Sequence, residues 1–232
     1  MRASAAVGLA AAGVAAGWAA PALAPIAAPV SRGLRIPRRT SVAGVALTFD
    51  DGPHPEGTPA VLALLERFNA DATFFMVGEQ VRRHPAVARA VVDAGHEVGI
   101  HGYRHRNVLR VSPPALERDL DAAAQEFTMV TDVPPSLYRP PYGVFSPTAL
   151  MSVRRRGWTP LLWSRWGRDW ARRATPTKIA ALVLEDVRPG DVVLLHDSDA
   201  YSASGSWRNT VGALERILQE LADRRLTTTV PS

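Results

Sequence analysis

The 232-residue sequence contains no cysteine and only one lysine, Lys178. The absence of cysteine excludes disulfides, thiolate metal sites and thiol nucleophiles, so histidine and carboxylate side chains must hold any bound metal. Every other one of the 27 basic residues is arginine, and together they outnumber the 22 acidic residues to give a formal net charge of +5. Because no nucleic-acid-binding motif accompanies this charge, we predict a basic surface and no nucleic-acid partner.

The amino-terminal part of the sequence lacks charge. No charged residue occurs from Ala3 to Ser31, and the run Ala5–Ala24 is mostly alanine, valine, leucine and glycine. Such a run is typical of a secretory signal or of an uncleaved membrane anchor. We therefore predict that residues 1–24 direct export, which would make the protein secreted or keep it in the cell envelope through a membrane tether.

The rest of the chain has the composition of a folded protein, since 47% of all residues are hydrophobic and 21% are charged. Residues 25–41 contain three prolines and four arginines, which predicts an extended linker. The folded domain is expected at residues 42–232, a length that suffices for one α/β domain with a sizeable core.

After the linker the sequence alternates between strand-like and helix-like segments. Seven short apolar or β-branched runs predict strands at Val45–Phe49, Ala72–Val77, Glu97–Ile100, Leu137–Tyr138, Leu161–Trp163, Val192–Leu195 and Thr227–Val230. Helical spacing or a helix-start pattern predicts helices at Thr58–Arg67, Pro85–Asp93, Ser112–Phe127, Thr175–Val187 and Asn209–Arg224. This alternation predicts a mainly parallel sheet that is either open or closed into a barrel.

Reactive side chains lie at the ends of these predicted strands or shortly after them. They are Asp50, Asp51, His101, Arg139, Asp169 and His196. In parallel α/β folds the carboxyl ends of the strands share one face, and active sites are built there. The six side chains are therefore expected to converge in one cleft.

The adjacent carboxylates of Asp50 and Asp51 repel each other, and burying them requires a cation such as a metal ion or an arginine. His101 and His105 are four residues apart and would lie on one face of a helical turn. With Asp51 they offer two nitrogens and one oxygen, which is the open ligand set of a catalytic metal site. Zinc is the first choice, while cobalt, nickel, manganese and iron fit the same ligands. Taken alone, the two patterns are also compatible with a solvated turn and with surface histidines.

Five short motifs stand in order along the chain: Thr48–Pro53, His101 to His105, Arg139–Gly143, Asp169-Trp170 and Leu194–Asp197. Together they resemble the motifs of the NodB-homology polysaccharide deacetylases, carbohydrate esterase family 4, over most of the chain. The resemblance implies an α/β fold, namely a distorted (β/α) barrel of about seven strands. It also implies hydrolysis of N-acetyl groups on a glucosamine-containing polysaccharide.

The resemblance assigns roles to the reactive residues. It implies that Asp51, His101 and His105 bind one divalent metal, which polarises the acetyl carbonyl. It makes Asp50 the general base that takes a proton from water, and His196 the general acid that protonates the departing sugar amine.

Other residues would support this reaction according to the same resemblance. Arg139 would hold the general base through charge-assisted hydrogen bonds, and Asp169 would orient the general acid and favour its protonated form. The backbone N–H of Tyr142 would stabilise the oxyanion together with the metal. Trp170 and Leu194 would line the pocket for the acetyl methyl group.

Two positions depart from the family pattern. Gly102 stands where the family usually has serine or threonine, which puts metal affinity in question. Trp166 stands where a further aspartate often opens the fourth motif, which would reshape the substrate groove. In the loop after His196, Tyr201 and Trp207 are expected either to stack on sugar rings or to pack.

Peptidoglycan is the first choice of substrate, and chitin oligomers come next. One alternative keeps the metal site but changes the bond, as in an acetyl-xylan esterase. The other is a carbohydrate-binding protein that retains the fold without catalysis. An acid and a base at the same site argue against the second alternative, because binding alone requires neither.

Overall fold

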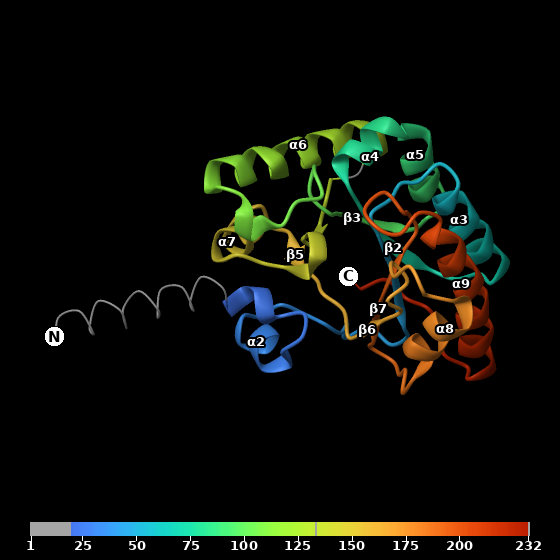
Figure 1. The fold of residues 1–232 in the computed structure, drawn as a ribbon. Helices are drawn as coiled ribbons and strands as arrows, with labels where there is room; N and C mark the ends of the chain where they lie inside the picture. Colours follow the sequence, from blue (N-terminus) through green and yellow to red (C-terminus); the bar gives the residue numbers. More distant parts are fainter. Residues whose placement is uncertain (1–19, 133, 232) are drawn as a thin grey trace.

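Seven parallel strands form one curled sheet in the computed structural model, which describes residues 20–132 and 134–231 (Figure 1). The strands are β1 (Ala46–Asp50), β2 (Ala72–Met76), β3 (Glu97–Ile100), β4 (Leu137–Tyr138), β5 (Thr159–Pro160), β6 (Arg165–Trp166) and β7 (Val192–His196). Their order across the sheet is β5-β4-β3-β2-β1-β7-β6. The predicted α/β fold, a distorted barrel of about seven strands, is confirmed.

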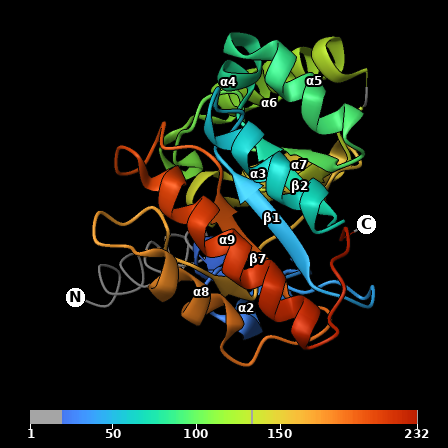
Figure 2. The same ribbon diagram turned by 90° about the vertical axis from the view of Figure 1, so that its right-hand side faces the viewer.

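Helices cover the outside of the curled sheet. The longer ones are α3 (Gly57–Arg67), α5 (Pro85–Asp93), α6 (Pro113–Thr131), α7 (Pro147–Arg155), α8 (Pro176–Leu184) and α9 (Ser206–Asp223). The shorter ones are η1 (Ala20–Leu23), α2 (Ala28–Gly33), α4 (Gly78–Arg83), η2 (Val108–Arg110) and η3 (Pro141–Gly143). Figure 2 shows α3 and α9 side by side over β1 and β7, and α9 also packs against α8.

The central strands are buried from end to end, as expected of a parallel sheet covered by helices. Every residue of β1 and of β2 is buried. The register pairs Asp50, the last residue of β1, with His196, the last residue of β7. Two of the predicted reactive residues therefore lie side by side at the carboxyl edge of the sheet.

Two predicted strands differ from the structure. Leu161–Trp163 is not a strand, because its backbone bonds go to two different segments: Leu161 N–H donates to Tyr138 and Leu162 N–H to Pro37. This stretch lies between the two-residue strands β5 and β6. Thr227–Val230 forms only an isolated bridge to Val45, so it does not extend the sheet.

Beyond residue 42, two α-helices were not predicted from the sequence, α4 and α7. The start of α7 carries a pattern that could have revealed it, because Ser146 precedes Pro147 and its hydroxyl accepts a hydrogen bond from Ala149 N–H at 3.1 Å. Serine before proline is a common helix start. The helix α4 has only six residues and begins with glycine, which leaves little pattern to detect.

The amino-terminal part of the described chain packs on the domain. Residues 25–41 were expected to be extended, but they contain the helix α2, and Ile36 is buried in the core. The predicted boundary at residue 42 stays a prediction. Of the predicted signal or anchor, residues 1–24, the first 19 residues lie outside the described part of the chain. Within the described ranges, no helix is long and apolar enough to cross a membrane.

Candidate active site

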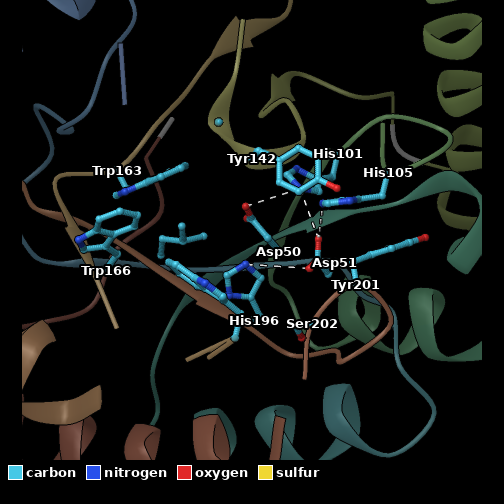
Figure 3. Close-up of a pocket in the computed structure, with 13 residues that line it drawn as sticks. Asp50, Asp51, His101, His105, Tyr142, Trp163, Trp166, His196, Tyr201 and Ser202 are labelled. Atoms are coloured by element: carbon cyan, nitrogen blue, oxygen red, sulfur yellow. Dashed lines mark ion pairs between the residues drawn. The ribbon is translucent and has the colours of Figure 1, made fainter. Parts of the chain in front are cut away.

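A pocket opens at the carboxyl edge of the sheet, where the strand ends bring the predicted residues together (Figure 3). Its lining includes Asp50, Asp51, His101, His105, His196 and the three predicted substrate-binding residues Tyr142, Trp170 and Leu194. Arg139 and Asp169 are completely buried behind this lining and contact Asp50 and His196, respectively. All ten residues predicted for the site therefore belong to one constellation.

Asp51, His101 and His105 present their ligand atoms to a common point. The Oδ1 of Asp51 lies 3.4 Å from His101 Nε2 and 3.2 Å from His105 Nε2. One ligand atom from each of the three residues lies within 4.8 Å of the others. The side chains are 2–5% exposed, so an ion held here would lose most of its water.

The hydrogen bonds and charges of these residues fit a cation. Within the described residues the buried Oδ1 of Asp51 has no hydrogen-bond partner, which is costly unless a ligand compensates. His101 Nδ1 lies 2.8 Å from the carbonyl of Arg139, an arrangement that places the proton on Nδ1 and leaves the Nε2 lone pair free. The three residues therefore have the ligand types and the orientation that a divalent metal needs.

The protonation states point in the same direction. Burial lowers the pKa of His101 to about 4, so its ring is neutral at neutral pH. Burial alone would raise the pKa of Asp51, but the neighbouring imidazoles of His105, His196 and His101 lower it to about 2. An anionic carboxylate and a neutral imidazole are the forms that bind metal.

Arg139 compensates the charge of Asp50, the other of the two adjacent carboxylates. Its Nη1 donates to Asp50 Oδ1 at 2.7 Å and to Thr48 Oγ1 at 2.8 Å. Its Nε and Nη2 donate to the carbonyls of Leu161 and Leu162, each at 3.1 Å. Asp50 is thus held by an arginine, whereas Asp51 faces the imidazoles of His101 and His105.

His196, which lines the pocket, is paired with the fully buried Asp169 behind it.

 The imidazole Nδ1 lies 2.9 Å from Asp169 Oδ1, and the other carboxylate oxygen accepts hydrogen bonds from His196 N–H at 2.7 Å and from the Thr210 hydroxyl at 2.8 Å. Burial by itself lowers the pKa of His196, but the charge and hydrogen bond of Asp169 outweigh it and raise the pKa to about 10. The ring is therefore protonated at neutral pH and can act as an acid.

The two histidines of the His-x3-His motif converge through a loop and not through the helical turn expected from their spacing. Residues 101–107 have no helical structure. Gly102 has a φ of +82°, in the left-handed region that favours glycine, and an added Cβ would lie 3.2 Å from the carbonyl oxygen of Arg104. Glycine at this departure from the family pattern thus suits the loop that carries the histidines.

Two residues without glycine's freedom also have a left-handed backbone at the site. Asp51 has a φ of 78° and Tyr142 a φ of 61°. Such conformations cost energy for residues that carry a Cβ, and they cluster at functional sites. In each case the turn directs the residue into the pocket lining.

Aromatic rings form the walls of the pocket. Trp170 meets the His196 ring edge-on, with centroids 5.4 Å apart, and Leu194 lies in the lining with them. Trp166, the second departure from the family pattern, packs at 5.4 Å from Trp170, and Trp163 continues the row at 5.9 Å. This wall makes one side of the pocket apolar, as an acyl group requires.

Tyr201 lies opposite this wall, and sequence reasoning left its role open between sugar stacking and packing. Its ring stacks on His105 with centroids 4.2 Å apart and an angle of 11° between the planes. Its hydroxyl donates to Glu79 Oε1 at 2.7 Å and accepts from Gln80 Nε2 at 3.1 Å. The buried His105 Nδ1 has no hydrogen-bond partner among the residues that the structure describes, so aromatic packing orients this ring.

Comparisons with known proteins add a family relationship to this geometry. A family model described as polysaccharide deacetylase matches residues 38–161. The peptidoglycan-N-acetylglucosamine deacetylase of Bacillus cereus is 39% identical over 181 residues, which cover 76% of this chain and 81% of the relative. The chitooligosaccharide deacetylase of Sinorhizobium fredii is 35% identical over 196 residues, covering 82% and 91%, respectively. Among solved structures, the family 4 carbohydrate esterase from Streptomyces lividans in complex with acetate matches with a TM-score of 0.73 at 30% identity, covering 82% of this chain and 93% of that chain.

Proposed function

The chain belongs to the polysaccharide deacetylase family, and on this premise we propose that it hydrolyses N-acetyl groups on a glucosamine-containing polysaccharide at the pocket described above. The observation that carries the proposal is the position of a carboxylate, Asp50, and a protonated imidazole, His196, on neighbouring strand ends. Amide hydrolysis needs a base for water and an acid for the departing nitrogen, and these two groups supply both.

The proton transfers follow from the hydrogen bonds of the two groups. The Arg139 guanidinium occupies one oxygen of Asp50, which leaves Oδ2 to take a proton from the attacking water. As the carbon–nitrogen bond breaks, His196 gives its Nε2 proton to the nitrogen, and the products are acetate and a free amine. Asp169 holds the opposite nitrogen of the ring and so keeps Nε2 directed at the pocket.

We propose that Asp51, His101 and His105 hold one divalent metal, with zinc as the first choice and cobalt, nickel, manganese or iron as alternatives. When bound, such an ion would supply Lewis-acid polarisation of the acetyl carbonyl. The burial of Asp51 Oδ1, with no hydrogen-bond partner in the described part of the chain, supports this assignment. The Tyr142 N–H is proposed to stabilise the oxyanion, and Trp170 and Leu194 to receive the acetyl methyl group.

The proposed polysaccharide is peptidoglycan first and chitin oligomers second, in line with the names of the two relatives. An acetyl-xylan esterase would use the same pocket, but an alcohol leaves more easily than an amine and has less need of a protonated acid. The Asp169–His196 pair supplies the kind of proton donor that a departing amine needs. The uncharged run Ala5–Ala24 supports a further proposal, that the protein is exported to the cell envelope, where such polymers occur.

The test is acetate release from peptidoglycan, chitin oligomers and acetylated xylan by protein stripped of metal and reloaded with single metals. Asp50→Asn keeps the side-chain shape and the hydrogen bond from Arg139 but removes the base, so turnover should fall by about 10²–10⁴-fold. Its metal content should stay unchanged. Asp93→Asn, at an exposed ion pair, is the matched control and should keep full activity.

Two outcomes would contradict the proposal. Acetate release that is indifferent to chelation and to added metal would rule out the assigned metal site. Unchanged turnover in Asp50→Asn would rule out the assigned base. A protein that binds the polymers but releases no acetate with any metal would instead be the non-catalytic carbohydrate-binding alternative.

A further inference from the structure

Six arginines surround a second groove, away from the active site. It lies between α2, the segment that follows α2, β6 and the start of β7, whereas the active site lies at the carboxyl end of β7. We call it the arginine groove, and its arginines are Arg32, Arg35, Arg38, Arg39, Arg165 and Arg188. One buried carboxylate, Asp191, is the acidic residue in the lining.

Three of these arginines are fixed by the protein. Arg38 Nε donates to the carbonyl of Trp163 at 2.9 Å. Arg39 pairs with Asp191 at 2.9 Å, and Arg165 lies 3.6 Å from the other oxygen of the same carboxylate. Arg165 also donates to the carbonyl of Asp186 at 2.7 Å. These contacts hold three guanidinium groups in place without the entropy that ordering them on a ligand would cost.

The other three arginines are exposed and have no side-chain partner within the described part of the chain. They are Arg32, Arg35 and Arg188. Six positive charges thus face one carboxylate, and Asp191 is already engaged by two arginines, by the Ser164 hydroxyl and by Arg188 N–H. Like charges gathered around a concave surface repel each other, and a bound anion would relieve that repulsion.

We propose that the arginine groove binds phosphodiester groups of a polyanion. The guanidinium group presents a planar fork of donors that matches phosphate oxygens, and it is the preferred side chain for phosphate recognition. Several forks around one groove favour a ligand with several phosphates over a single small anion. The groove shares no lining residue with the acetyl pocket. Of two neighbours on β6, Trp166 lines the pocket and Arg165 lines the groove.

Phosphodiester groups can come from a soluble polymer or from lipid headgroups, and the neighbouring surface makes the lipid worth testing. Leu23 and Ile26, shortly before α2, are 49% and 72% exposed. Apolar side chains next to basic ones are common on surfaces that contact anionic membranes. Two probes therefore separate the sources: soluble poly(glycerol phosphate), and vesicles of phosphatidylcholine with or without phosphatidylglycerol.

The experiment compares two triple variants of the full chain that lose the same charge. The groove variant carries Arg32→Gln, Arg35→Gln and Arg188→Gln, which break no side-chain hydrogen bond or ion pair within the described residues. The matched control carries three exchanges of exposed arginines on α4, α6 and α9, namely Arg83→Gln, Arg118→Gln and Arg216→Gln. Both variants should deacetylate a short chitin oligomer like the parent chain, which establishes that they are folded.

The groove variant should lose at least about tenfold in affinity for at least one of the two probes, because each lost charge-assisted contact is worth about that much. The slope of log affinity against log salt should fall by about 2 for a flexible polyanion, at roughly 0.7 per lost contact. The control should change by less than about threefold. Binding to the soluble polymer identifies a phosphodiester chain as the source, and binding only to phosphatidylglycerol vesicles identifies a headgroup.

Equal losses in the two variants would overturn the proposal, since they would reflect net charge and not the groove. No measurable binding of either probe by the parent chain would overturn it as well.

Discussion

Replacing Asp169 with asparagine removes one negative charge from a buried pair while preserving the shape of the side chain. Asp169 Oδ2 accepts from His196 N–H and from the Thr210 hydroxyl, and Oδ1 faces His196 Nδ1. The amide oxygen of asparagine can keep the first two donors only if its NH₂ group faces Nδ1. Because Nδ1 must then accept, the variant should hold a neutral ring with its proton on Nε2.

This change should be large for catalysis. A neutral imidazole is a far weaker acid than an imidazolium, so kcat should fall by about 10²–10⁴-fold on an amide substrate. In the parent protein the pKa of His196 is raised to about 10, and activity should persist to alkaline pH. In the variant the protonated ring exists only below its ordinary pKa, so the remaining activity should decline above about pH 6.

The free energy of unfolding should depend on pH with a defined sign. A folded pKa raised from 6.5 to about 10 contributes stability that is fully present below pH 6.5 and is lost as the pH rises through 10. Removing one partner of a buried pair costs about 3–5 kcal/mol. The difference in unfolding free energy between parent and Asp169→Asn should therefore be largest near pH 6 and should shrink toward pH 10.

The assay combines acetate release from pH 5 to 10.5 with urea unfolding at pH 6 and pH 10, on metal-loaded protein. A metal at Asp51 would lower the pKa of His196 by neutralising a nearby negative charge, but the contribution of Asp169 keeps its sign. Thr210→Val is the control, because it removes one hydrogen bond to Asp169 and leaves the charge pair intact. A variant with the parent's pH profile, or a stability difference that grows toward pH 10, would refute the reasoning.

Two further predictions concern the residues around the proposed metal site. Tyr201→Leu removes the ring that stacks on His105 and should weaken metal affinity by about 3- to 10-fold, measured by competition with a chelator. Tyr201→Phe keeps the ring and should retain most of the affinity. Equal losses in both variants would assign the effect to the hydroxyl. Gly52→Ala would place a Cβ against the buried carboxylate of Asp197 and should lower the free energy of unfolding, measured in urea, by about 1–3 kcal/mol. Gly33→Ala, with open space around it, should not lower it. A neutral Gly52→Ala would contradict the close packing.

The convergence of the reactive residues could be predicted from the sequence because parallel strands bring their carboxyl ends to one edge. Asp50 and His196 end central strands with clear apolar patterns, and His101 follows another. The register that pairs the first two is a consequence of those strands. The adjacent carboxylates also predicted a compensating cation such as a metal ion or an arginine, and Arg139 is that cation for Asp50.

Other features depend on tertiary contacts that leave no periodic pattern. Tyr201 lies in a loop rich in serine, aspartate and glycine, and its position is set by hydrogen bonds to Glu79 and Gln80, more than a hundred residues away. Thr227–Val230 has the β-branched residues of a strand but finds only one bridge partner. The spacing of His101 and His105 suits a helix, yet a glycine with positive φ leads this segment into a loop.

The contacts of Arg139 have a consequence for interpreting related sequences. Besides its bond to Asp50, its guanidinium donates hydrogen bonds to Thr48 and to two carbonyls in the stretch between β5 and β6, where strand pairing is sparse. A descendant that abandoned hydrolysis could exchange Asp50 for a neutral residue and still need the arginine to join these segments. The presence of this arginine therefore says little about whether a homologue is active, and the carboxylate beside it is the residue to inspect.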